Sequence, residues 1–155
     1  MELNTMLKKL EMPIQNLGIE MVNEIISVLQ QNNKIATGNL INSVKYEYQV
    51  DIDTIKLLIQ SEDYLEYVDK GRDPGKFVPV DKLREWIRIK GIPEKALYPI
   101  NYKIFKFGIK PLNFLESIRA TYSSKGKFGI IVKEYNKIIS DYMKWEFKQI
   151  QKNIK

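Results

Sequence analysis

The residue types that carry most enzyme chemistry are missing from this chain. It contains no histidine and no cysteine, which excludes disulfides, zinc fingers, Cys or His nucleophiles and the Ser-His-Asp triad. The usual general base near neutral pH is absent as well. An enzyme built from this chain would have to use carboxylates, Lys, Tyr or a hard metal ion. We therefore predict a non-enzymatic protein without a cofactor.

Residues 71–77, GRDPGKF, resemble a phosphate-binding loop in composition but not in spacing. Three residues separate Gly71 from Gly75, where the motif needs four. Phe77 stands where a Ser or Thr would bind Mg²⁺. We predict no nucleotide site here.

An acidic group precedes and enters the same loop: Glu62, Asp63, Glu66, Asp69 and Asp73. These carboxylates could surround a hard cation, as in a metal-dependent nuclease. Their positions lack the ligand spacing of a calcium loop, so we predict no metal site.

The C-terminal region combines lysines with aromatic residues, among them Tyr142, Trp145 and Phe147. Lysines can contact phosphates and aromatic rings can stack on bases, so nucleic-acid binding is one interpretation. An amphipathic membrane helix is another. The aromatic residues recur at helical spacing, which favours packing in a core or an interface.

Charge is distributed in blocks along the chain. Residues 46–73 carry eight acids and three bases, a net of −5, whereas residues 81–110 carry eight bases and three acids, a net of +5. Residues 125–155 again carry eight Lys and three acids. Such blocks can be solvated faces, a basic face for nucleic acid, or complementary faces through which copies of the protein meet.

Length and composition indicate a single globular domain over residues 1–155. The chain is 44% apolar and 28% charged, as is usual for soluble domains. No apolar run reaches the about 20 residues that cross a bilayer, and the N-terminus lacks a signal-peptide pattern. We expect synthesis in the cytoplasm and no membrane association.

Periodicity predicts helices around a small sheet. Apolar residues at steps of three and four indicate a helix over residues 13–31 after a short lead-in, with Pro13 either kinking it or standing in its first turn. Residues 36–40 indicate a turn, with Gly38 suited to a positive φ. Alternation predicts two strands, 44–50 and 55–60, joined as a hairpin by a turn at 51–53.

Further helices are predicted beyond the hairpin. Residues 64–68 are apolar and aromatic, typical of a short helix or strand. Two amphipathic helices follow, 81–90 with Asp81 as N-cap and Gly91 as stop, and 93–107 ended by Gly108. Residues 109–118 could return to the sheet, and a long helix is expected over 130–153 with an apolar stripe wider than one face. The helical pair could be a DNA-reading helix-turn-helix, but its turn lacks small-residue packing.

A turn-rich loop separates the acidic, aromatic segment from the helical pair. Gly71, Pro74, Gly75 and Pro79 mark it as a turn region, and long loops in compact domains are commonly functional. We predict that it is an inter-subunit contact loop without chemistry. The residues of this predicted loop are Arg72, Asp73, Pro74, Gly75, Lys76, Phe77 and Pro79.

Three segments, read in order, resemble the neck or tail-completion family of tailed bacteriophages. They are TGNL at 37–40, YLEYVDKG at 64–71 followed by PVDKLREWIRIKGI, and GIKPLNFL at 108–115. The resemblance covers about residues 36–116. Its motif residues are Thr37, Gly38, Asn39, Leu40, Tyr64, Tyr67, Gly71, Trp86, Gly108, Pro111 and Phe114. The chain departs from the family pattern at Val68-Asp69-Lys70-Gly71, where Glu-Phe-Gly-Thr is common, and in its longer helical segment.

The resemblance implies an α+β fold: a small antiparallel β-sheet packed by an N-terminal helix, with a central helical pair, a long extended loop and a long C-terminal helix. It implies a structural virion protein that forms a homo-oligomeric ring of six or twelve copies in the neck. Such a ring would join portal or adaptor proteins to the tail and pass genomic DNA without sequence specificity. The alternative from the residues themselves is a basic, non-enzymatic nucleic-acid-binding module.

Overall fold

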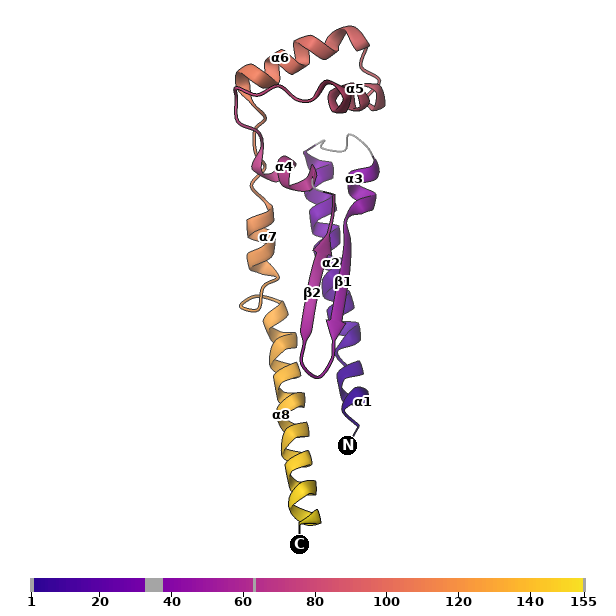
Figure 1. The fold of residues 1–155 in the computed structure, drawn as a ribbon, viewed down its shortest axis with the longest axis vertical. Helices are drawn as coiled ribbons and strands as arrows, with labels where there is room; N and C mark the ends of the chain where they lie inside the picture. Colours follow the sequence, from indigo (N-terminus) through magenta and orange to yellow (C-terminus); the bar gives the residue numbers. More distant parts are fainter. Residues whose placement is uncertain (1, 33–37, 63, 155) are drawn as a thin grey trace. The chain divides into compact units, whose positions relative to one another are not determined.

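The computed structural model describes residues 2–32, 38–62 and 64–154, and these form an α+β fold (Figure 1). Their strands make one two-stranded antiparallel sheet, as predicted. The elements in chain order are α1 (Leu3–Lys8), α2 (Glu11–Gln31), α3 (Gly38–Ser43), β1 (Lys45–Val50), β2 (Ile55–Gln60), α4 (Tyr64–Lys70), α5 (Val80–Ile89), the 3₁₀ turn η1 (Glu94–Ala96), α6 (Leu97–Phe107), α7 (Leu115–Thr121) and α8 (Phe128–Asn153). Among the described helices, none is long and apolar enough to cross a membrane.

Two compact units divide the chain. The first comprises residues 1–23, 46–59 and 118–155, and the second comprises residues 24–45 and 60–117. Each unit is therefore assembled from segments that are distant in the sequence. The single domain over residues 1–155 stays a prediction.

The first unit contains the hairpin, and its strands alternate as predicted. Tyr46, Tyr48 and Val50 are half-buried between exposed neighbours on β1, and β2 repeats this pattern. In the turn, the Asp51 side chain accepts the Asp53 N–H at 3.0 Å. Asp51 N–H also donates to the Thr54 carbonyl at 2.9 Å. The Asp-Ile-Asp segment thus closes the hairpin through an aspartate that bonds its own backbone.

Helix α2 packs on β1 through Gly18 and Gln15. A Cβ on Gly18 would lie 2.5 Å from the Tyr46 ring, so only glycine leaves room for that ring. One turn earlier, Gln15 Nε2 donates to the Tyr48 hydroxyl at 2.6 Å. Pro13 stands in the first turn of α2, where its missing N–H costs little. The N-terminal helix therefore covers the sheet, as predicted.

Helix α8 packs against α1 in the same unit. Leu7 and Leu10 form a buried cluster with Tyr135 and Ile138. The Tyr135 hydroxyl donates to the Ile52 carbonyl in the hairpin turn at 2.9 Å. These contacts bury one side of the N-terminal half of the predicted long helix.

The second unit is built on the predicted helical pair. Leu83, Ile87 and Leu97 form its buried cluster. Helix α5 ends in a Schellman motif, because Gly91 N–H donates to Arg88 and Ile92 N–H donates to Ile87. Gly91 has φ +66°, which confirms it as the stop of this helix.

Three local predictions are wrong. Asp81 is not the N-cap of α5: Pro79 holds that position without a side-chain bond, and Asp81 lies in the first turn. Gly38 begins helix α3 and does not lie in a turn, so TGNL leads first into a helix. Residues 115–121 form helix α7 and do not return to the sheet. The Asp69 carboxylate accepts the N–H groups of Phe114 and Leu115 and so caps the start of this helix.

Candidate interaction surface

The predicted contact loop is bonded to its own unit. Arg72 and Ile109 form an antiparallel bridge, with Arg72 N–H donating to Ile109 O at 2.9 Å and Ile109 N–H donating to Arg72 O at 2.8 Å. The bridge joins the start of the loop to the segment that follows α6. The two strands of backbone are 37 residues apart in the sequence.

Two glycines of the family resemblance make this bridge possible. Gly71 and Gly108 both have φ +70°, in the region that favours glycine. A Cβ on Gly71 would lie 2.3 Å from Ile109 O, and one on Gly108 would lie 2.2 Å from Arg72 O. Each glycine therefore allows the backbone of the other segment to approach, which explains why both positions carry no side chain.

Two more attachments hold the loop along α6. Gly75 N–H donates to the Phe105 carbonyl at 2.7 Å. Asn101, 4% exposed, accepts the Val78 N–H at 2.8 Å and donates to the Val78 carbonyl at 2.9 Å. The loop backbone is thus bonded to α6, while Asp73, Pro74, Lys76 and Phe77 remain exposed. Contact with a neighbouring subunit stays a prediction.

The loop and α6 together display a row of aromatic rings. Phe77 stacks on Phe105 with ring centroids 4.3 Å apart and planes 11° from parallel, and Tyr102 lies 6.4 Å from Phe105. Tyr98, Tyr102 and Phe105 follow one another at steps of four and three, so they share a face of the helix. We call these four residues, Phe77, Tyr98, Tyr102 and Phe105, the α6 aromatic surface.

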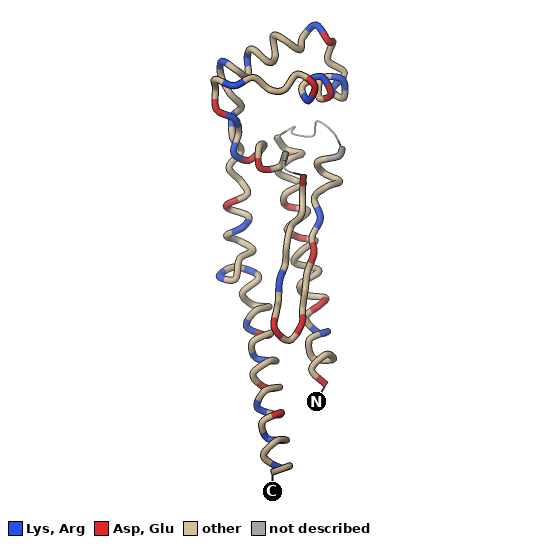
Figure 2. Tube along the Cα trace, viewed as in Figure 1, with Lys and Arg blue, Asp and Glu red and all other residues tan. Residues whose placement is uncertain are grey.

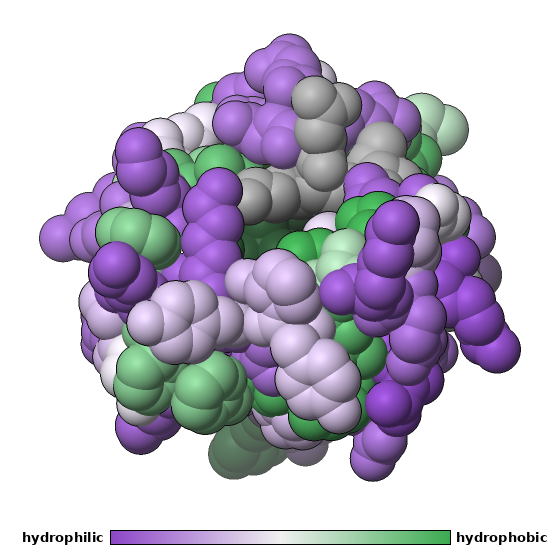
Figure 3. All heavy atoms as spheres, turned by 90° about the horizontal axis from the view of Figure 1, so that it is seen from above, coloured by the Kyte–Doolittle hydropathy of each residue, from purple (hydrophilic) through white to green (hydrophobic). Residues whose placement is uncertain are grey.

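This surface is open to solvent. Tyr98 is 70% exposed, Tyr102 58% and Phe77 55%. Figure 3, the view from above, shows ring-bearing side chains side by side among hydrophilic and apolar groups. Exposed large apolar groups gathered in this way are typical of binding sites.

Its surroundings are basic. Residues 95–115 contain four Lys and no acid, and Figure 2 shows positive residues along α6. Lys106 Nζ lies 5.3 Å from the centre of the Phe107 ring, close enough for a cation–π contact. An acidic or electron-rich partner therefore suits this face.

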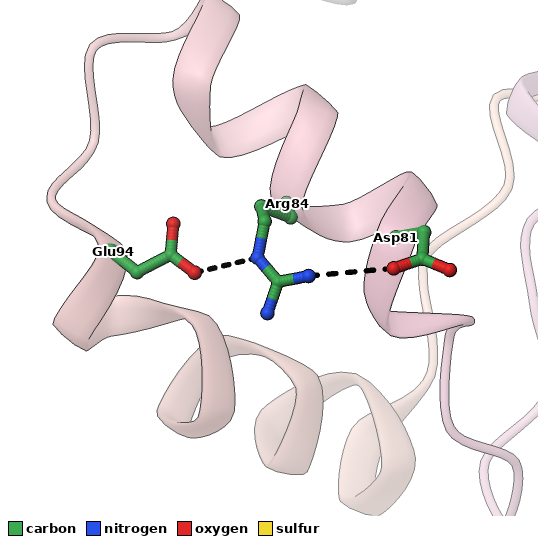
Figure 4. Close-up of polar contacts among 3 residues, drawn as sticks. All are labelled: Asp81, Arg84 and Glu94. Atoms are coloured by element: carbon green, nitrogen blue, oxygen red, sulfur yellow. Dashed lines mark hydrogen bonds and ion pairs between the residues drawn. The ribbon is translucent and has the colours of Figure 1, made fainter.

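A charged network lies beside the helical pair. Arg84 Nε donates to Glu94 Oε1 at 2.6 Å and its Nη1 lies 3.4 Å from Asp81 Oδ1 (Figure 4). The hydrogen bond with Glu94 raises the pKa of Arg84. These residues line an open hollow of about 720 Å³. The network joins α5 to η1. Because its arginine and two carboxylates are paired at the solvent-exposed surface, it adds little to the free energy of unfolding.

Asp69 has a structural role that the sequence did not reveal. Its side chain is buried, and Oδ1 accepts the backbone N–H groups of Phe114 at 2.6 Å and Leu115 at 2.9 Å. Asp69 therefore caps the start of α7 from 45 residues away. Capping is normally recognised from the residue next to a helix, so a single sequence carries no signal for this contact.

The remaining motif residues are spread over the second unit. Leu40 is buried in α3, which also holds Gly38 and Asn39, while Thr37 lies outside the described residues. Tyr64 begins α4 and Tyr67 is exposed on it. The structure brings Gly71, Gly108 and Pro111 together at the bridge. Trp86 packs against the α5–α6 cluster and Phe114 is buried.

Within the described ranges, no group of three or more acidic residues is placed to hold a metal ion. In particular, the buried Asp69 carboxylate is occupied by backbone N–H groups. No family model, curated protein or solved structure matches this chain.

Proposed function

We propose that this chain is a structural protein of a tailed bacteriophage particle. It forms a ring in the neck, joins portal or adaptor proteins to the tail, and surrounds the DNA passage without catalysing a reaction. The resemblance over residues 36–116 is the basis of this assignment. It is supported by the Arg72–Ile109 bridge, which Gly71 and Gly108 allow and which ties two of the resembling segments together within the second unit.

The α6 aromatic surface is the structural observation that carries the proposed contact with a protein partner. Aromatic residues supply much of the binding energy at protein interfaces, and a preorganised loop lowers the entropy lost on binding. Here the loop is bonded to α6 at Gly75 and Val78 and to the segment after α6 at Arg72, while Phe77 and Tyr102 stay exposed. The surface is therefore suited to docking a protein partner, whether a second copy or the adjacent ring.

Opposite charges on two blocks of the chain would orient adjacent copies in the ring. A ring needs two different surfaces that meet head to tail. Acidic residues 46–73 and basic residues 81–110 have net charges of −5 and +5. Contact between these blocks on adjacent copies would be favourable and would weaken with salt.

The first test is the mass of the oligomer by light scattering, at low and high salt. We expect a closed assembly of about six or twelve copies. Replacing Phe77 and Tyr102 together with Ser should prevent assembly while the far-UV CD spectrum is retained. The matched control is Phe107→Ser, because Phe107 is 65% exposed and helical periodicity places it on the opposite side of α6 from Tyr98.

The second test is the composition of phage particles released by the host that encodes this chain. An antibody against the chain should label the junction of head and tail. Absence of the chain from these particles would contradict the proposal.

Nucleic-acid binding is the competing outcome. Exposed Tyr98 and Tyr102 beside Lys103 could stack on single-stranded bases. A monomer that binds single-stranded DNA, loses binding with salt, and is absent from particles would favour that function instead. DNA binding by a ring would not, because a neck ring also contacts DNA.

A further inference from the structure

The C-terminal half of α8 carries an apolar stripe that is exposed to solvent. Met143 is 59% exposed, Phe147 62%, Ile150 53% and Ile154 78%. They follow one another at steps of four, three and four, and Ile154 is the C-cap residue with a helical backbone conformation, so the four share one face. We call these four residues the α8 stripe.

The stripe begins where the core of the first unit ends. Tyr135 and Ile138 are buried in the cluster with α1, and Ile139 packs at its edge. The next residues on the Ile139 side of the helix are those of the α8 stripe. From their exposed fractions and typical side-chain areas, they present about 500 Å² of mostly apolar surface, as much as the largest patch on a typical monomer.

The charges around the stripe suit packing against protein. Lys148 and Lys152 fall on the far side of the helix from the stripe. Glu146 lies at one edge of the stripe, where its carboxylate accepts a hydrogen bond from the Tyr142 hydroxyl at 2.6 Å. Gln151, at the other edge, is uncharged. A second apolar helix could therefore approach without bringing like charges together.

We propose that the α8 stripe binds the α8 stripe of a second copy of this chain in antiparallel orientation. The spacing of four, three and four reads the same in both directions. Reversing one helix about the middle of the stripe therefore places Phe147 against Ile150 of the second copy and Met143 against Ile154. The same arrangement brings Lys144 near the uncharged Gln151 of the other copy.

The area is sufficient for a specific pair. Two stripes together remove on the order of 1,000 Å² from water, the lower limit for a specific protein interface. A two-fold axis makes the contact isologous, which is the commonest form of homodimer. This pairing is separate from the head-to-tail contacts of the proposed ring, because it uses a different surface and a different symmetry.

Sedimentation velocity from about 1 to 200 µM tests the pairing over the affinity range of modest interfaces. The wild-type chain should associate, and Phe147→Glu should weaken association at least tenfold while far-UV CD keeps its helical signal. Lys148→Glu is the control, because it places a carboxylate at the adjacent position, on the far side of the helix from the stripe. A monomeric wild-type chain, or unchanged association of Phe147→Glu, would overturn the proposal.

Orientation is tested with single cysteines, because the chain has none of its own. A mixture of Lys144→Cys and Gln151→Cys chains should form the mixed disulfide in preference to either homodimer. Absence of the mixed product would overturn the antiparallel arrangement. The Phe77 and Tyr102 double substitution should leave this cross-link intact, so failure of the ring and failure of α8 pairing are distinguishable.

Discussion

The α6 aromatic surface and the α8 stripe are both exposed apolar surfaces on helices, but they are built differently. Phe77 reaches the first surface only because residues 72, 75 and 78 are bonded to α6 and the segment after it. The stripe needs nothing beyond the helical repeat of α8. One surface depends on contacts between distant residues, and the other depends on local periodicity.

This difference predicts how each surface responds to substitution. Substitutions that disturb the backbone contacts of residues 72, 75 and 78 should lower both the free energy of unfolding and the affinity for a partner. Changes in the α8 stripe should alter association and leave the stability of the single chain nearly unchanged, because its side chains are already in water.

Gly108→Ala should be the most disruptive single change. Gly108 has φ +70° and ψ −163°, a region open almost only to glycine, and its Cβ would lie 2.2 Å from Arg72 O. Strain and overpacking together should lower the free energy of unfolding by about 4 kcal/mol. Urea unfolding followed by Trp86 fluorescence, in a Trp145→Phe background, measures this loss in the second unit.

Gly91→Ala separates backbone strain from crowding. Gly91 also has a positive φ, but a Cβ there would meet nothing within 4 Å. Gly91→Ala should lower the free energy of unfolding through backbone strain alone, by about 1 kcal/mol. Equal losses for Gly108→Ala and Gly91→Ala would show that crowding against Arg72 adds nothing to the backbone strain at Gly108.

Asp69→Ala should have the next largest effect. It removes two hydrogen bonds from a buried carboxylate to the start of α7. Hydrogen bonds to charged groups contribute more than neutral ones, so we expect a loss of about 3 kcal/mol in the same urea assay. Asp69→Asn keeps an oxygen acceptor and should lose less. The exposed Asp73→Ala should stay near wild type, and a comparable loss there would contradict the capping role of Asp69.

Local periodicity gave most of the elements in advance. The alternation of Tyr46, Tyr48 and Val50 predicted β1, and the stops at Gly91 and Gly108 are confirmed. The continuation of the apolar stripe of α8 past its core residues was also visible in the sequence. In each case the signal lies within a few residues of the feature that it predicts.

The contacts that build the candidate surface could not be predicted in the same way. The sequence marked residues 72–79 as a contact loop, but not the bonds of Gly75 and Val78 to α6. Asp69 looked like one of several acids near a turn, yet it caps a helix 45 residues later. Pairings of this kind depend on the tertiary fold, and a single sequence holds no record of which distant residues meet.

The smallest effect concerns Tyr135, which joins α8 to the hairpin. Burial raises the pKa of this buried phenol, and the carboxylates of Asp51 and Asp53 add to the shift. The folded state therefore holds the proton more tightly than the unfolded state, whose Tyr pKa is about 10. Its contribution to stability is present below pH about 10 and is lost as pH rises through the higher folded-state pKa.

Tyr135→Phe should remove that pH dependence along with the hydrogen bond to the Ile52 carbonyl. At neutral pH we expect a loss of about 1 kcal/mol, and above pH about 10 the variant should lose less additional stability than the wild type. Thermal unfolding at a series of pH values measures both quantities. Tyr67→Phe, which changes an exposed phenol in the second unit, is the control. If the variant and wild type decline in parallel at high pH, the fold does not raise the pKa of Tyr135.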